Sequence, residues 1–138
     1  MKTVRILKII VLILWMIVIF LLSNQTGNES TILSDGVINS SICKFISNCN
    51  PEVYSFIVRK LAHILIYLIL GIFSLMNFKN DKEGLINAFI LCITYAFFDE
   101  LHQMFINNRS GEIRDIFIDM IGSISGILLF YKIRKKRS

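Results

Sequence analysis

The sequence predicts an all-α membrane protein whose four transmembrane helices pack as a bundle. Hydrophobic residues make up 54% of the 138 residues, and the chain has one proline. The apolar residues come in long blocks and do not alternate with polar ones at the period of an amphipathic helix or strand. With its flanking turns, each block reaches the roughly 20 residues that cross a bilayer. We therefore expect helices near 4–22, 58–78, 84–104 and 113–132, within a single domain that spans residues 1–138.

The first apolar block, residues 9–22, follows a basic start that contains Lys2, Arg5 and Lys8. A cleaved signal peptide has the same general form. However, the stretch SNQTGNES that follows has no cleavage site of the Ala-x-Ala kind. We therefore interpret this block as an uncleaved transmembrane helix.

The second helix has a clear start signal in the stretch NPE at residues 50–52. Asn50 can cap the helix, Pro51 suits its first position, and Glu52 suits its first turn. A helix from Pro51 to Asn77 is about 40 Å long, so we expect it to begin above the membrane.

The third and fourth helices are apolar for most of their length. Residues 84–98 contain no Asp, Glu, Lys or Arg, and residues 116–131 contain one such residue, Asp119. Gly122 and Gly126 form a Gly-x-x-x-Gly motif, which lets a neighbouring helix approach closely. Cys92 lies in the middle of the third helix and is expected to serve in packing.

The orientation follows from the basic residues, which stay on the cytoplasmic side of a membrane protein. Ten of the fifteen Lys and Arg residues lie at the two ends of the chain and in the loop before the third helix. Both termini, including a basic tail at 132–138, are therefore expected in the cytoplasm. The formal charge of +5 is then a topology signal and does not indicate a nucleic-acid partner.

The long outer segment, residues 23–57, is rich in Ser and Asn, and its apolar residues recur at roughly helical spacing. We expect a short amphipathic helix on the outer leaflet there. Cys43 and Cys49 fall in this segment, where oxidation is permitted, but their spacing leaves open whether they form a disulfide.

Polar side chains occur at one common depth, in the outer end of every helix. Those of the last three helices are Lys60, His63 and Tyr67 in the second, Asp99, Glu100, His102 and Gln103 in the third, and Asp115 and Asp119 in the fourth. A charge that faces lipid costs about 2.5–3.5 kcal/mol on insertion scales, so these groups must point inward. At about 100° per residue, Asp99, His102 and Gln103 share one face, and Glu100 points about 100° away from Asp99 but lies within reach of the face of Gln103. We expect a polar pocket that opens toward the extracytoplasmic side.

The chemistry of this pocket remains open on the residues alone. Four cations can balance four acids, so the cluster can be a structural ion network. A metal site from His63, His102, Asp99 and Glu100 is disfavoured, because His-x-x-x-His and Glu-x-x-His spacings do not occur. No Gly-x-Ser-x-Gly nucleophile motif is present. General acid–base chemistry by Glu100 and His102 is one hypothesis. Binding is the other, with Lys60 and Arg109 on an anionic group.

Three stretches carry a resemblance to a known family. They are SNQ at 23–25, RKLAHILIYLIL at 59–70 and DELHQMFINNRSGEIRDIFIDMIGSISG at 99–126. With them the chain resembles the VanZ-like family of small bacterial membrane proteins, whose pattern usually has an asparagine in place of Asp119. The resemblance implies as motif residues Lys60, His63, Tyr67, Asp99, Glu100, His102, Gln103, Arg109 and Asp115.

The resemblance also implies a function at the cell envelope. The family's namesake is associated with low-level resistance to teicoplanin, a lipoglycopeptide that acts on cell-wall precursors outside the membrane. We therefore expect a pocket that handles a lipid-linked or lipid-like ligand in the bacterial cytoplasmic membrane, with membrane lipids, a cell-wall precursor or a lipoglycopeptide as partners. The expected binding residues are Lys60, His63, Tyr67, Asp99, Gln103, Arg109, Asp115 and Asp119. The alternative is a membrane-embedded enzyme that uses Glu100 and His102. No cofactor or metal is expected in either case.

Overall fold

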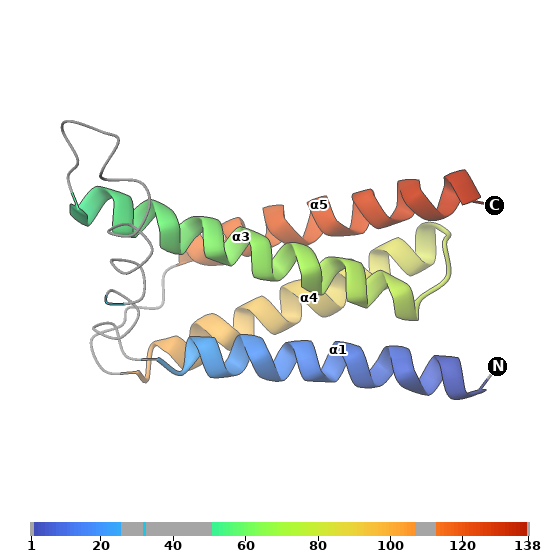
Figure 1. The fold of residues 1–138 in the computed structure, drawn as a ribbon, viewed down its shortest axis with the longest axis horizontal. Coiled ribbons are helices and arrows are strands. Elements are labelled where there is room, and N and C mark those ends of the chain that lie inside the picture. Colours follow the sequence, from blue (N-terminus) through green and yellow to red (C-terminus); the bar gives the residue numbers. More distant parts are fainter. Residues whose placement is uncertain (1, 26–31, 33–50, 107–112, 138) are drawn as a thin grey trace.

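The computed structural model describes residues 2–25, 32, 51–106 and 113–137. In these residues four long helices follow one another along the chain (Figure 1): α1 (Lys2–Ser23), α3 (Pro51–Asn77), α4 (Lys82–Gln103) and α5 (Ile113–Arg137). Each is long and apolar enough to cross a membrane. The predicted all-α fold with four transmembrane helices is therefore confirmed. Cys43 and Cys49, with nearly all of the expected outer helix, lie outside the described residues.

The helix ends have local causes in the sequence. Helix α3 begins at Pro51, the position that the NPE stretch predicts. Helix α4 begins after Asp81, whose side chain accepts a hydrogen bond from the Gly84 backbone N–H at 2.7 Å and so caps the helix. Helix α5 continues to Arg137, so the basic tail extends this helix beyond its expected apolar end.

The helices form one bundle in which α3 contacts all three others. Its most extensive contact is with α5, and the two run side by side in the same direction (Figure 1). Helix α4, which lies between α3 and α5 in the sequence, runs in the opposite direction and packs on both. Helix α1 packs on α3 and α4. Both termini lie at the same end of the bundle (Figure 1). The last residue of α3, Asn77, and the first residue of α4, Lys82, lie at that end too.

The contact between α3 and α5 depends on the Gly-x-x-x-Gly motif. A Cβ atom added at Gly122 would meet the backbone carbonyl of Ile64, and one added at Gly126 would meet that of Leu68. Both carbonyls belong to α3, so the two backbones touch where the glycines lie. The close helix approach predicted from this motif is confirmed, and the neighbour is α3.

Side-chain hydrogen bonds attach α1 to the rest of the bundle. The indole N–H of Trp15 donates to the Ile66 carbonyl of α3 at 2.9 Å. The Tyr95 hydroxyl of α4 donates to the Met16 carbonyl at 2.5 Å. Cys92 is a buried free thiol in the core of the bundle, as expected for a packing residue. In lipid, packing and such hydrogen bonds hold helices together, since lipid tails are as apolar as the core.

The glycine contact predicts a large effect of bulk at Gly126. We expect Gly126→Leu to lower the free energy of unfolding by about 2–4 kcal/mol, because the new side chain must displace the α3 backbone. Ser125→Leu is the matched control, since this exposed neighbour is on the same helix and its substitution should change stability by only about 0.5 kcal/mol. Unfolding in mixed detergent micelles measures both. Equal effects of the two substitutions would contradict the contact.

Candidate functional site

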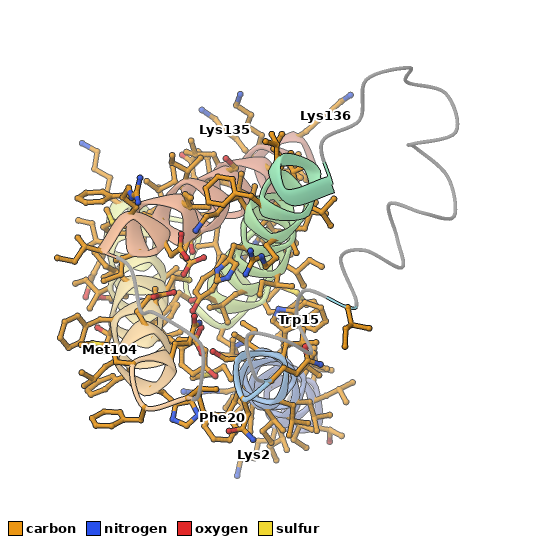
Figure 2. All side chains as sticks on the ribbon, turned by 90° about the vertical axis from the view of Figure 1, so that its left-hand side faces the viewer. Lys2, Trp15, Phe20, Met104, Lys135 and Lys136 are labelled. Atoms are coloured by element: carbon orange, nitrogen blue, oxygen red, sulfur yellow. The ribbon has the colours of Figure 1, made fainter. Side chains whose placement is uncertain are left out.

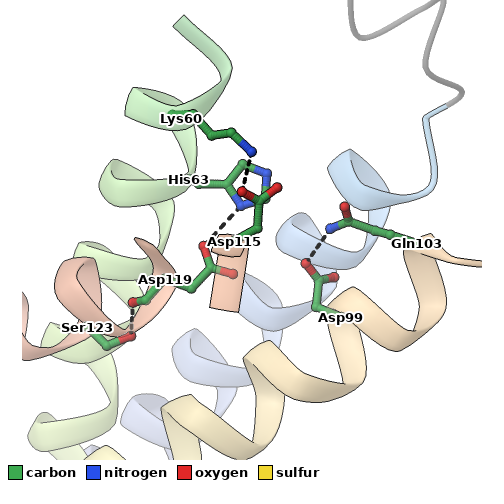
Figure 3. A network of polar contacts seen from close by, with 7 residues as sticks. All are labelled: Lys60, His63, Asp99, Gln103, Asp115, Asp119 and Ser123. Carbon is green, nitrogen blue, oxygen red and sulfur yellow. Dashed lines mark hydrogen bonds and ion pairs between the residues drawn. The ribbon is translucent and has the colours of Figure 1, made fainter. Parts of the chain in front are cut away.

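The polar side chains predicted at one depth meet at the end of the bundle opposite the termini (Figure 3). Figure 2, which views the bundle from that end, shows nitrogen and oxygen atoms gathered between the helices. We call this group the polar cluster. It consists of Lys60, His63 and Tyr67 from α3, Asp99, Glu100 and Gln103 from α4, and Asp115 and Asp119 from α5. All except Lys60 are buried.

Two contacts join α3 to α5 within the cluster. Lys60 forms an ion pair with Asp115. One turn further along, His63 Nδ1 lies 3.0 Å from Asp119 Oδ1. These two side-chain contacts are followed along both helices by the backbone contact of Gly122 with Ile64. The parallel register that brings the two backbones together therefore also pairs the side chains. Figure 3 shows both side-chain contacts.

Helix α4 adds carboxylates and an amide. The Gln103 amide donates to Asp99 Oδ2 at 3.0 Å, one turn away on the same helix. Glu100 turns toward the other two helices. A carboxylate oxygen of Glu100, one of Asp119 and a ring nitrogen of His63 all lie within 4.8 Å of one another. Three helices therefore converge on one small volume.

His102 lies elsewhere than the sequence grouping suggests. Its Nε2 is 3.4 Å from Asn24 Oδ1, and its ring stacks on Phe20 with centroids 4.8 Å apart, so it contacts α1 and its end. The reason is helix geometry: the buried face of α4 runs through Ala96, Asp99 and Gln103, and His102 falls at the edge of that face. The cluster therefore takes Asp99, Glu100 and Gln103 from α4, and His102 lies beside it, against Phe20 and Asn24.

Some residues bear on the site without having been predicted, and one predicted residue cannot be placed. Asn24 is the partner of His102, and its position in the SNQ stretch was the one signal for it. Ser123 donates to the Asp119 carbonyl at 2.8 Å within α5, a contact without a sequence signature. Arg109, expected to bind an anion, lies outside the described residues.

Two polar atoms of the cluster are buried without a hydrogen-bond partner in the described part of the chain, Tyr67 Oη and Asp119 Oδ2. Both side chains are 0% exposed. A buried polar group left unsatisfied costs about 1–3 kcal/mol, and more if it is charged. Such atoms are rare in native proteins and each requires a reason. The cluster thus has acceptor and donor capacity that these helices do not use among themselves.

Chemically, the cluster can do three things. Its carboxylates can accept hydrogen bonds from hydroxyl or amino groups or bind a cation. Lys60 can attract an anionic group while it remains near Asp115. Glu100 and His63 can exchange protons with a bound group, because they are close to each other and shielded from solvent.

Four membrane-spanning helices with buried ionisable side chains near one end define a small multi-pass α-helical membrane protein. A family model, VanZ/LLP1, matches residues 8–134, which is nearly the whole chain. The chain therefore belongs to the VanZ/LLP1 family, in agreement with the resemblance carried by its motifs. No curated protein matches the chain, and no solved structure matches it.

The Lys60–Asp115 pair predicts strong energetic coupling. We expect Lys60→Met and Asp115→Leu each to destabilise the protein, because each removes one member of an ion pair that is mostly shielded from solvent. The double substitution should cost less than the sum of the two, with a coupling free energy of about 1–3 kcal/mol. Unfolding in mixed micelles measures the cycle. Lys60→Met combined with Glu83→Gln, at opposite ends of the bundle, is the control and should be additive.

Proposed function

We propose that the polar cluster faces the extracytoplasmic side and binds a lipid-linked or lipid-like ligand of the bacterial envelope. The observation that carries the proposal is the convergence of buried ionisable side chains from three membrane-spanning helices. Ionisable groups inside a membrane are expensive, and they usually mark a binding or transport site. Two unsatisfied buried atoms, Tyr67 Oη and Asp119 Oδ2, support a role for the cluster beyond holding the helices together.

The surface beside the cluster suits the apolar part of such a ligand. Large apolar side chains are exposed along the end of α4, namely Phe97, Phe98, Leu101, Met104 and Phe105. An acyl or polyprenyl chain can lie against them within the bilayer while its polar head reaches the cluster. A ligand with a long apolar tail and a polar head, such as a lipid-linked cell-wall precursor or a lipoglycopeptide, has this combination of properties.

The charge of the opposite end supports the orientation. A cavity of about 810 Å³ at that end is lined by several basic side chains, among them Arg5, Lys8, Lys79 and Arg134. Arg134 is fixed there by hydrogen bonds to the carbonyls of Leu75 and Phe78. Basic residues accumulate on the cytoplasmic side of membrane proteins. We therefore place the termini in the cytoplasm and the polar cluster on the outside.

Protection against teicoplanin-type antibiotics is the biological role that we propose for this binding. It rests on membership of the VanZ/LLP1 family together with the resemblance of the motifs to the VanZ-like pattern. An outward-facing site at the level of the membrane surface is where a lipoglycopeptide or its lipid-linked target can be reached.

Catalysis is the second candidate, and one observation favours a specific form of it. Glu100 lies close to His63, whereas His102 contacts Asn24 and Phe20. If the protein turns over a lipid head group or a precursor, we assign proton transfer to Glu100 and His63, in place of the pair Glu100 and His102 suggested by the sequence. Loss of either group should then lower the rate by about 10²–10⁴-fold.

The orientation predicts which positions are accessible from outside the cell. After replacement of the native cysteines, a membrane-impermeant thiol reagent should label Val53→Cys in intact cells, because this exposed position is in the first turn of α3, at the cluster end of the bundle. Lys79→Cys, exposed at the end of the termini, should react only after permeabilisation. Labelling of Lys79→Cys in intact cells would reverse the orientation.

The binding role predicts a phenotype for Glu100→Gln. At matched expression in a host that depends on the protein for teicoplanin resistance, this variant should lose resistance, since it alters a buried acceptor of the cluster. Glu83→Gln is the matched control, because it makes the same change on the same helix at the exposed opposite end. Mass profiles of lipids and precursors separate the two candidates: an unchanged profile with lost resistance supports binding, and an altered profile supports catalysis. If the Glu100→Gln strain matches the wild type in both readouts, the cluster has no such role.

A further inference from the structure

We infer that His63, Glu100 and Asp119 form a binding site for a divalent transition-metal ion such as Zn²⁺. One ligand atom from each of the three residues lies within 4.8 Å of the other two. Ligand atoms that bind one Zn²⁺ ion at about 2.0–2.2 Å in tetrahedral geometry stand about 3.3–3.6 Å apart, so the side chains need to close by about 1 Å on binding. All three side chains are buried.

The residue types suit this ion. Imidazole and carboxylate groups are ordinary ligands of zinc, and three protein ligands leave a fourth position for water or for a bound molecule. The ligands come from three different helices, so the packing of the bundle fixes their separation. The sequence shows no metal-binding motif for this site, because the spacings His-x-x-x-His and Glu-x-x-His describe ligands that lie on one helix.

Two buried polar atoms next to these ligands support a metal site. Asp119 Oδ2 is fully buried and has no hydrogen-bond partner in the described part of the chain, although Oδ1 of the same carboxylate contacts His63. The Tyr67 hydroxyl is likewise buried without a partner there. Tyr67 is one turn from His63 on α3 and lies within electrostatic range of Glu100 and Asp119. A metal ion would take the free carboxylate oxygen, and the phenol can donate to a water on the metal.

The local charge permits a cation at this position. Lys60, the cation of the polar cluster, already forms an ion pair with Asp115, so its charge is largely offset. One neutral imidazole and two carboxylates around a divalent ion give a set with no net charge. Such a set is the form in which ionisable groups are least costly within a membrane.

The test is metal content of the purified full-length protein in detergent, prepared without a polyhistidine tag. The protein is stripped with a chelator, reloaded with Zn²⁺, and its bound metal and affinity are measured by mass spectrometry and competition with a zinc dye. We expect about one equivalent of Zn²⁺ in the wild type. His63→Ala, Glu100→Gln and Asp119→Asn should each weaken binding by at least about tenfold, since loss of even an outer-shell partner has an effect of that size.

His102→Ala and Glu83→Gln are the matched controls, because they remove a histidine and a glutamate that lie outside the proposed ligand set. Both should keep the wild-type affinity. Glu100→Gln and Asp119→Asn preserve side-chain volume, so they decide the matter if His63→Ala fails to fold. The inference is overturned if the wild type binds no Zn²⁺, if the three ligand variants bind as tightly as the wild type, or if the controls lose as much. The readout is independent of antibiotic susceptibility, so this site and the proposed envelope role can fail separately.

Discussion

The contact of the α3 and α5 backbones at Gly122 and Gly126 sets the geometry of the whole cluster end. Because the two helices run in parallel and touch, residues about 55 to 58 positions apart in sequence come level with each other, from Lys60 and Asp115 to Leu68 and Gly126. This register places His63 beside Asp119 without further adjustment. Bulky side chains at the glycines would separate the backbones, and the polar pairs would lose contact together. Packing and electrostatics are thus coupled at one interface.

The fold could be predicted from composition because a bilayer leaves few alternatives. Backbone groups in lipid must be satisfied internally, so long apolar blocks such as residues 61–78 must be helices. The start of α3 at Pro51 and the close approach at Gly126 also had local causes that a sequence displays directly. By contrast, the contact of Trp15 with Ile66 joins residues 51 positions apart and has no local signature.

The candidate site was predictable in membership but less so in arrangement. Depth alone brought Lys60, His63 and Asp119 together, because charged groups at one level of a membrane must point inward. The rotation of α4 was harder to predict, since Glu100 and His102 flank the face of Asp99 and Gln103 on opposite sides, and the rotation of the helix decides which of the two faces the cluster. In the structure His102 stacks on Phe20 of α1 and contacts Asn24 just after that helix, and Glu100 faces the cluster. Such tertiary packing is not encoded in the periodicity of one helix.

The long sequence separation between α3 and α5 has a consequence for biogenesis. In a chain that enters the membrane from its N-terminus, α3 is synthesised before α5 exists, so Lys60 and His63 then lack the carboxylates that they contact in the finished protein. Both residues lie in the first half of α3, and the long apolar stretch after them lowers the cost of holding this helix in the membrane before α5 is present. The lysine can extend toward the head groups while Leu65 and the residues after it hold the segment in lipid. Insertion of α5 then completes the pairing, so a helix that is made later neutralises the charges of α3.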